Sequence, residues 1–238
     1  MLDLSALAGL PICLAADGTL ALSGDVAWGD QGVRTLADLV PVGLCPPADG
    51  AGSVAYRMYR GLALAAHRPL FESKRLRYDL TILCGDGGGE PVRTFGHTHP
   101  PGYGEVYQVL AGVACFLLEW RDPPRCVAVT AEQGQAAYIP PGYGHVTVNA
   151  GPGSLALANL VSVEFDSCYD WYRERGGPAF HPVRAAGSLA WVANSRCLQL
   201  PQLERALAAQ SEWSFACKSL YQAFLAAPES FAFLQGAG

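Results

Sequence analysis

The sequence has little charge and no strongly basic cluster. Only 16% of its 238 residues are charged, and the formal net charge at neutral pH is −5. The densest basic run is Lys74-Arg75-Leu76-Arg77, which is more typical of a solvated strand end than of an anion-binding surface. The sequence therefore has none of the basic character expected of a nucleic-acid-binding protein.

Long hydrophobic segments are also missing. No apolar run reaches the ~18 residues that a membrane-spanning helix needs, so we expect no membrane partner. Residues 1–11 contain Asp3 and no basic residue, unlike the start of a secretory signal peptide. The eight cysteines form no C-x-x-C pair and are expected to be buried, reduced thiols, as is usual in the cytoplasm. We therefore expect a cytoplasmic protein.

Histidine is scarce, but its few copies are concentrated. Three of the five histidines lie in two short segments, Gly-His-Thr-His-Pro-Pro-Gly-Tyr-Gly-Glu at 96–105 and Pro-Pro-Gly-Tyr-Gly-His at 140–145. Side chains two residues apart on an extended chain point to the same face, so His97 and His99 can reach one ion. Glu105 and His145 would then arrive from other strands, and the four together predict a metal site.

The donor set indicates the class of metal. Three neutral imidazole nitrogens and one carboxylate oxygen suit a divalent first-row transition metal better than calcium or magnesium. Iron, manganese, nickel and zinc all tolerate these ligands. The alternative interpretation keeps the same fold and leaves the histidines as hydrogen-bonded core groups without a metal.

The pattern of elements predicts an all-β fold. Half of the residues are hydrophobic, which is enough for a sizeable core. Short alternating or apolar segments read as strands at 54–60, 76–83, 105–110, 113–120, 126–130, 136–139, 145–149 and 155–163. Such closely spaced strands favour a sandwich or barrel. The Gly-rich segment 85–89 is expected to be a turn, because no helix and no Lys-Ser/Thr follow it.

Three regions are expected in one domain. Residues 1–53 form an N-terminal extension packed on the barrel, with a helical turn at 35–40. Residues 54–165 form the barrel itself. Residues 166–238 form a helical C-terminal segment, with one helix beginning near Asp166 and another at 201–225, where apolar residues recur near helical spacing.

The spacing of the metal motifs resembles that of a known superfamily. Gly112 follows Glu105, and Gly134, Pro140, Gly142, His145 and Asn149 follow in turn, in intervals that resemble both motifs of the cupins, which have a double-stranded β-helix (jelly-roll) fold. The likeness extends from about residue 33 to 197 and is similar in detail to the cupin-type glucose-6-phosphate isomerases of archaea and some bacteria. The segments that carry it are Val33-Arg-Thr-Leu-Ala-Asp38, Val54-Ala-Tyr56, Leu80-Thr-Ile-Leu83, Thr94-Phe-Gly-His-Thr-His99, Glu105-Val-Tyr107, residues 140–149, and Tyr169-Asp-Trp-Tyr-Arg-Glu-Arg-Gly-Gly177.

This resemblance implies an isomerase of glycolysis and gluconeogenesis that acts on a sugar phosphate as a homodimer. It places the substrate phosphate near Tyr56, Thr81, Thr94 and Gly96, and it places Tyr107 beside the metal. Two positions depart from the archaeal pattern, where Val161 stands in place of a tyrosine and Ser167 in place of a histidine.

The predicted reaction is the aldose–ketose isomerisation of a phosphorylated sugar. Glu105 would be a metal ligand or the base that moves the proton, and Tyr107 would orient a hydroxyl or relay a proton. A hydride shift is the rival route. The other hypotheses are a cupin dioxygenase or decarboxylase that uses the same metal ligands, and a sugar-binding cupin without catalysis.

Overall fold

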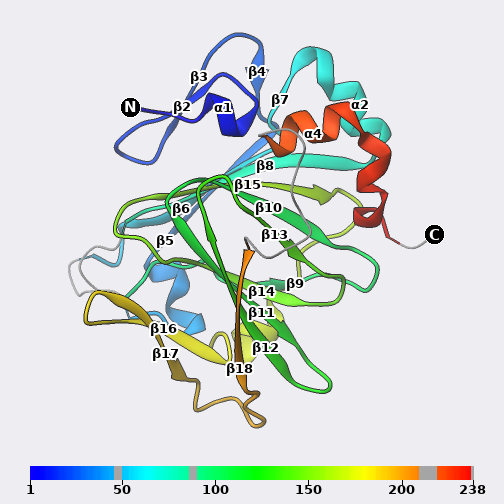
Figure 1. Ribbon diagram of the computed structural model, residues 1–238. Helices are drawn as coiled ribbons and strands as arrows, with labels where there is room; N and C mark the ends of the chain where they lie inside the picture. The colour runs from blue at the N-terminus through cyan, green and yellow to red at the C-terminus, as the bar shows by residue number, and fades with distance from the viewer. Residues whose placement is uncertain (46–49, 86–89, 209–218, 237–238) are drawn as a thin grey trace.

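Two β-sheets form the body of the protein (Figure 1). The computed structural model describes residues 1–45, 50–85, 90–208 and 219–236. The larger sheet has six strands in the order β13-β10-β15-β8-β6-β5, all antiparallel. Their bounds are β5 Asp30–Thr35, β6 Val54–Arg60, β8 Leu76–Leu83, β10 Glu105–Ala111, β13 Ala136–Ile139 and β15 Leu155–Ser162.

The smaller sheet has five strands in the order β18-β12-β11-β14-β9. Its strands are β9 His97–Thr98, β11 Val113–Trp120, β12 Arg125–Glu132, β14 Gly144–Asn149 and β18 Leu203–Leu207. All its pairings are antiparallel except that of β12 with β18, which is parallel. The metal motifs therefore lie on both sheets, because His97 and His145 belong to this one and Glu105 begins a strand of the other.

The central strands of the larger sheet are covered on both faces, which explains their apolar sequences. Every residue of β15 and β10 is buried. Tyr107 and Leu157 pack in one core cluster with Phe116 of the smaller sheet, whereas Val106 and Leu160 pack in a second cluster that includes residues of the N-terminal segment and of α4. A strand buried on both faces reads as an almost continuous apolar run, as Leu155-Ala-Leu-Ala-Asn-Leu-Val does.

Small elements surround the two sheets. At the N-terminal end they are β1 Leu2–Asp3, α1 Ser5–Ala8, β2 Ile12–Leu14, β3 Leu20–Leu22, β4 Val26–Ala27, the 3-10 helix η1 Ala37–Val42, β7 Ala63–Leu64, the 3-10 helix η2 Ala65–His67 and α2 Arg68–Ser73. After the barrel they are α3 Asp170–Glu174, the hairpin of β16 Phe180–Ala185 and β17 Ser188–Ala193, α4 Leu220–Ala226 and the 3-10 helix η4 Pro228–Leu234. Figure 1 shows α2 and α4 beside the N-terminal elements on one side of the larger sheet.

The predicted all-β jelly-roll architecture is confirmed, and so are its central strands. Each strand predicted between residues 54 and 163 is present, with ends that differ by at most a few residues. The helical turn predicted at 35–40 is the 3-10 helix η1, shifted towards the C-terminus. Most of the Gly-rich turn predicted at 85–89 lies outside the described residues.

The predicted N-terminal boundary of the barrel at residue 54 is wrong. Strand β5 pairs with β6 from Asp30 opposite Arg60 to Thr35 opposite Val54, so the larger sheet already includes residues 30–35. The alternation of β5 is weak because it is an edge strand with mostly exposed or half-buried residues, and this concealed it in the sequence.

The C-terminal segment is not mainly helical. Residues 203–207, predicted as part of a helix, form β18, and two more strands make the β16–β17 hairpin. Strand β18 pairs along β12, and Arg125 makes two hydrogen bonds of 2.9 and 3.0 Å to Glu204. An open strand edge supplied backbone partners that outweighed the local helical pattern. Of the other predicted helical residues, Trp213 and Ala216 lie outside the described residues, and Leu220 and Phe224 are helical.

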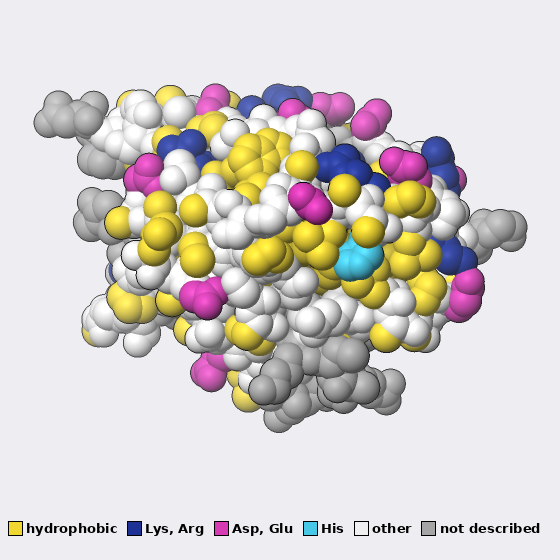
Figure 2. Space-filling model, turned by 90° about the horizontal axis from the view of Figure 1, so that it is seen from above, with side chains coloured by type: hydrophobic (Ala, Val, Ile, Leu, Met, Phe, Trp, Pro, Cys, Tyr) yellow, Lys and Arg dark blue, Asp and Glu magenta, His cyan; other side chains and the backbone are white. Residues whose placement is uncertain are grey.

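Two surface properties bear on the predicted environment. In the described part of the chain, no helix is long and apolar enough to cross a membrane. The seven cysteines of that part are free, but Cys45 and Cys168 are exposed, so the prediction of uniformly buried thiols is wrong for these two. On the face seen in Figure 2, basic side chains occur in small groups close to acidic ones.

Candidate metal centre

The two predicted motif segments come together at one end of the barrel. Strand β9 pairs with β14 so that His97 lies opposite His145, and Glu105 is the first residue of β10 on the other sheet. His99 follows β9 by one residue. Gly96 has φ of +87°, and a Cβ atom there would lie 2.6 Å from Cγ2 of Val146. The turn into His97 therefore requires glycine.

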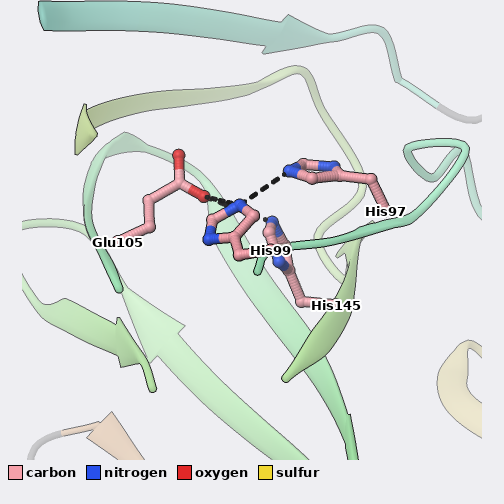
Figure 3. Close-up of side chains that lie close together, drawn as sticks. All are labelled: His97, His99, Glu105 and His145. Carbon is pink, nitrogen blue, oxygen red and sulfur yellow. Dashed lines mark hydrogen bonds and ion pairs between the residues drawn. The ribbon is translucent and has the colours of Figure 1, made fainter. Parts of the chain in front are cut away.

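The four predicted ligands form one compact cluster (Figure 3). One donor atom from each of His97, His99, Glu105 and His145 lies within 4.8 Å of all the others. The Nε2 atoms of His97 and His99 are 3.0 Å apart, and Oε2 of Glu105 is 3.4 Å from Nε2 of both His99 and His145. The structure thus unites residues that are up to 48 positions apart in the chain.

Burial keeps the imidazoles of the cluster neutral. It lowers the pKa of His99 to about 4 and the pKa values of His97 and His145 well below the usual value. In both of the latter, neighbouring imidazoles lower the pKa further. A neutral imidazole has a free nitrogen lone pair, which is the form that binds a metal.

The pKa of the Glu105 carboxyl group shifts in the opposite direction to the pKa values of the histidines. Burial raises its pKa to about 8, and its Oε2 atom is buried without accepting any hydrogen bond. A divalent cation between the four groups would satisfy this oxygen and reverse the pKa shift, because it stabilises the ionised carboxylate. The orphaned oxygen and the nitrogen-rich donor set therefore fit a divalent transition metal.

Neighbouring side chains orient the Glu105 carboxylate and the His145 ring. Asn159 donates a hydrogen bond of 2.6 Å from Nδ2 to Oε1 of Glu105, and the Tyr107 hydroxyl is 3.2 Å from Nε2 of His145. Burial, and then the nearby Glu105 carboxylate, raise the pKa of Tyr107 well above its usual value. Tyr107 therefore stays protonated and available as a hydrogen-bond donor beside the cluster.

The sequence interpretation missed Asn159, although a signal was present. Asn159 is the one amide in the otherwise apolar strand Leu155-Ala-Leu-Ala-Asn-Leu-Val, and it lies opposite Tyr107 in the β10–β15 register. A polar side chain in a strand buried on both faces needs a hydrogen-bond partner. An asparagine at this position therefore indicates a polar partner on a neighbouring strand, and that partner is Glu105.

A cavity opens beside the cluster and includes charged residues that were not predicted to act there. It is lined by Met58, Arg60, Arg77, Asp79, Thr81, His97, His99, Glu105, Tyr107, Asn159, Val161, Phe165, Ser167 and Tyr169. Arg77 was interpreted as part of a solvated strand end, but it lines this cavity. Its signal was the alternation of Arg77, Asp79 and Thr81 on β8, which places all three on one face. Val161 and Ser167, the two departures from the archaeal pattern, line the same cavity.

Of the four residues predicted near the substrate phosphate, the structure places one in the cavity. Thr81 lines it, whereas Tyr56, Thr94 and Gly96 lie in and around the segment that leads to His97. The Tyr56 hydroxyl accepts a hydrogen bond of 3.3 Å from the Phe95 amide, and Oγ1 of Thr94 accepts one of 2.9 Å from the amide of Thr147. These two hydroxyls therefore support the backbone around the histidines.

Comparisons with solved structures find matches at low identity. A mutant oxalate decarboxylase from Bacillus subtilis is 16% identical, with 61% of this chain and 31% of that chain covered and a TM-score of 0.38. An oxalate oxidase in complex with the substrate analogue glycolate is 11% identical, with 62% and 54% covered and a TM-score of 0.34. The 7S globulin of Momordica charantia is 16% identical, with 47% and 30% covered and a TM-score of 0.36. The chain thus spans about half or less of the length of these proteins.

A comparison with curated protein sequences found no match. The family model described as Glucose-6-phosphate isomerase (GPI) matches residues 33–196, which is more than half of the chain. This range agrees with the resemblance seen in the sequence, and it includes all four residues of the metal cluster and the central strands of both sheets. The chain therefore belongs to the glucose-6-phosphate isomerase family, in its cupin form.

Proposed function

We propose that this protein is a metal-dependent aldose–ketose isomerase of a phosphorylated sugar, with glucose-6-phosphate and fructose-6-phosphate as the first pair to test. The observation that carries the proposal is the coincidence of the family match with the cluster of the half-buried His97 and the buried His99, Glu105 and His145. A reacting carbon placed in the adjoining cavity would be within reach of both Glu105 and Tyr107, which line it together.

The four clustered residues would hold one divalent ion, with iron, manganese, nickel and zinc all compatible with the donor set. When bound, such an ion supplies Lewis-acid stabilisation of the oxygen that becomes negatively charged during isomerisation. The protein contributes the fixed donor positions and the burial that keeps the imidazoles unprotonated.

Glu105 is the proposed proton carrier. In the open-chain aldose it takes the proton from C2 and returns it to C1, while the hydroxyl proton on O2 is transferred to O1. Asn159 holds one carboxylate oxygen, and the other faces the imidazoles at 3.4 Å. One carboxylate can therefore serve as a metal ligand and as a base, in turn or together. General-base catalysis of this kind contributes about 10²–10⁴-fold to the rate.

Tyr107 is the proposed donor to the sugar oxygens. Its raised pKa keeps the hydroxyl protonated, so it can donate to O1 or O2 and relay the proton between them. It also contacts the ring of His145 and lies opposite Asn159 across the β10–β15 pair. In this position Tyr107 would transfer the proton between O2 and O1 while Glu105 transfers the proton between C2 and C1.

Substrate binding remote from C1 and C2 would hold these carbons in place. Binding energy from a terminal phosphate can be used to position the reacting atoms. Thr81 is available for this role from inside the cavity, and Tyr56, Thr94 and Gly96 remain proposed contributors through the segment they support. A homodimer that acts in the cytoplasm completes the proposal, and its support is the family resemblance.

The test is interconversion of glucose-6-phosphate and fructose-6-phosphate by metal-loaded protein. Turnover should disappear with EDTA and return when Fe(II), Mn(II), Ni(II) or Zn(II) is added. Glu105→Gln should lower kcat by at least about 10²-fold, with a much smaller change in KM. Glu119→Gln is the matched control, because Glu119 is similarly buried but does not line the cavity.

The isotope content of the product separates the two routes. In D₂O, proton transfer through Glu105 should introduce solvent deuterium at C1 of the ketose, whereas a hydride shift would retain the substrate hydrogen. The isomerase proposal is wrong if a panel of sugar phosphates gives no turnover with any of the four metals. Oxygen uptake with an unphosphorylated acid would then favour the dioxygenase hypothesis.

A further inference from the structure

A second cavity lies on the outer face of the smaller sheet, between the β11–β12 turn, α3 and the segment that joins β17 to β18. Glu119 of β11 lines it and pairs with Gly144, whereas the preceding Leu118 pairs with His145 of the metal cluster. Successive residues of a strand point to opposite faces, so this outer cavity and the metal cluster lie on opposite faces of the sheet. The outer cavity has a volume of about 360 Å³, which suits a small molecule, and it shares no lining residue with the cavity beside the metal cluster (the metal cavity).

The outer cavity concentrates positive charge in an acidic protein. Its charged lining residues are four arginines and one carboxylate: Arg121, Arg125, Arg175, Arg196 and Glu119. The chain has only 16 Lys and Arg residues and a formal net charge of −5. Glu204 offsets the charge of Arg125 through two hydrogen bonds of 2.9 and 3.0 Å, and Glu119 offsets that of Arg175. Two arginine charges therefore remain uncompensated among these groups, which favours an anionic ligand.

Arg175 is fixed in the wall of the outer cavity. Its Nη2 forms an ion pair of 2.7 Å with Oε1 of Glu119, and its guanidinium carbon lies 3.8 Å from the centre of the Trp171 ring. The same Glu119 oxygen accepts a hydrogen bond of 2.9 Å from the Ala179 amide. The side chains of Arg175 and Glu119 are only 15% and 2% exposed. Arg175 is therefore part of a rigid wall, and its charge is already used.

Arg121 and Arg196 keep their guanidinium groups free. Both residues are exposed. Arg121 lies over the Trp171 ring, 4.6 Å from its centre, and Arg196 packs on the backbone of Gly176, where a Cβ atom would lie 2.8 Å from its Nη1. Within the part of the chain that the structure describes, neither guanidinium group has a hydrogen-bond or ion-pair partner. Their N–H donors can therefore bind a phosphate in the bidentate geometry that arginine favours.

An indole ring adds an apolar surface to the same cavity. Trp120 lines the cavity and is 36% exposed. Its Nε1 donates a hydrogen bond of 2.7 Å to the Asp122 carbonyl, and its ring packs on Tyr143 with 5.1 Å between the ring centres. The ring also lies so close to Gly142 that a Cβ atom there would be 2.7 Å away. A fixed and partly exposed indole is a surface on which a nucleobase can stack.

We propose that the outer cavity binds a nucleoside polyphosphate, with its phosphates on Arg121 and Arg196 and its base on Trp120. The two features together select this class of ligand. Inorganic phosphate would use the guanidinium donors and leave the indole exposed, and an uncharged aromatic ligand would leave the arginines unpaired. The site is separate from the metal centre, so the inference does not rest on the proposed isomerase activity.

The test is calorimetric titration of the metal-loaded protein with ATP and with tripolyphosphate, which has the phosphates without the nucleoside. Each ligand is saturated with Mg²⁺ so that it does not extract the bound metal. ATP should bind with a Kd of about 1 mM or lower. Arg121→Gln and Arg196→Gln should each weaken the binding of both ligands by about 10-fold, the lower end of the range for a hydrogen bond to a charged group. Because both side chains are exposed and unpaired, the melting temperature should not change.

A third position tests the base. Trp120→Leu should weaken ATP binding by at least about 5-fold and leave tripolyphosphate binding unchanged, because only the base stacks on the indole. Trp120→Phe keeps an aromatic face and the packing on Tyr143, so it guards against misfolding and should retain most of the ATP affinity.

Two control variants locate the binding. Arg173→Gln removes a charge from α3, where Arg173 pairs with Asp170 outside the outer cavity, and Arg60→Gln removes one from the metal cavity. Both should bind ATP as the wild type does. Equal losses of ATP affinity in Arg60→Gln and Arg121→Gln, or no ATP binding at millimolar concentration, would overturn the site. Equal affinity of the wild type for ATP and tripolyphosphate would overturn the assignment of a nucleoside ligand.

Discussion

Replacing Asn159 by leucine should weaken metal binding by about 10- to 150-fold without unfolding the barrel. Asn159 and Glu105 are both buried, at 4% and 3% exposure, and they share a hydrogen bond of 2.6 Å. A hydrogen bond to a charged group contributes about 1.5–3 kcal/mol, which corresponds to this range of affinity. Leucine is close to asparagine in shape, so no large cavity is created.

The effect should appear in metal affinity because Asn159 orients a ligand. Without the amide, the carboxylate of Glu105 loses the partner of Oε1 and can rotate away from the imidazoles. Loss of a residue that orients a metal ligand typically lowers metal affinity or activity by about 10–100-fold, which agrees with the hydrogen-bond calculation.

The assay is competition with a chelator for Zn(II) or Mn(II), together with thermal denaturation of the metal-free protein. Asn149→Leu is the control, since Asn149 is also buried and its Nδ2 donates at 3.1 Å to Cys84 and at 2.6 Å to Gly153, but it does not line the metal cavity. This control should lower the melting temperature and leave metal affinity unchanged. Wild-type metal affinity in Asn159→Leu, or equal losses in both variants, would refute the reasoning.

The site geometry and the family resemblance lead to three more predictions. Gly96→Ala should destabilise the protein by at least about 1–2 kcal/mol and reduce metal content, because alanine disfavours the left-handed backbone and its Cβ would clash with Val146; Gly153→Ala, which meets no atom within 4 Å, should be close to neutral in the same denaturant titration. The metal-free protein should be most stable near pH 6.5. Below that value His97, His99 and His145 bind more protons in the unfolded chain than in the folded protein, where their pKa values are lowered. Each of these histidines therefore costs up to about 1.4 kcal/mol of stability per pH unit. Glu105 affects stability in the opposite direction, because folding raises its pKa from 4.5 to about 8. The stability that this group contributes to the folded protein is therefore lost as pH rises from about 4.5 to 8. Urea titrations at several pH values in EDTA check the curve, and a maximum well above pH 8 would contradict it. Sedimentation equilibrium should give twice the mass of one chain, and a monomer at micromolar concentration would exclude the predicted homodimer.

The four residues of the proposed metal site were predictable because their signal is local. Two histidines two residues apart on an extended strand share a face wherever that strand lies. The Gly residues around them mark turns that the structure uses, as the positive φ of Gly96 and Gly142 shows. The strands were predictable for a related reason, since alternation and continuous apolar runs record the burial of each face.

The residues around the four proposed metal ligands were harder to place from the sequence. A threonine hydroxyl in a sequence looks the same whether it faces a ligand or a neighbouring amide. The structure shows that Thr94 accepts from the amide of Thr147, a residue 53 positions away. The sequence likewise does not show what an arginine side chain faces, so Arg77 was interpreted as part of a solvated strand end. In the structure Arg77 lies opposite Val161 and lines the metal cavity.

The sequence by itself determined the all-β class, most of the central strands and the four residues of the metal cluster. These depend on periodicity and on short spacings, which are properties of neighbouring residues. Only the tertiary structure decided that Asn159 orients Glu105, that Arg77 faces the cavity and that residues 203–207 pair with β12 as a strand. These outcomes depend on which strands lie side by side and in which register, and contacts between distant segments set both.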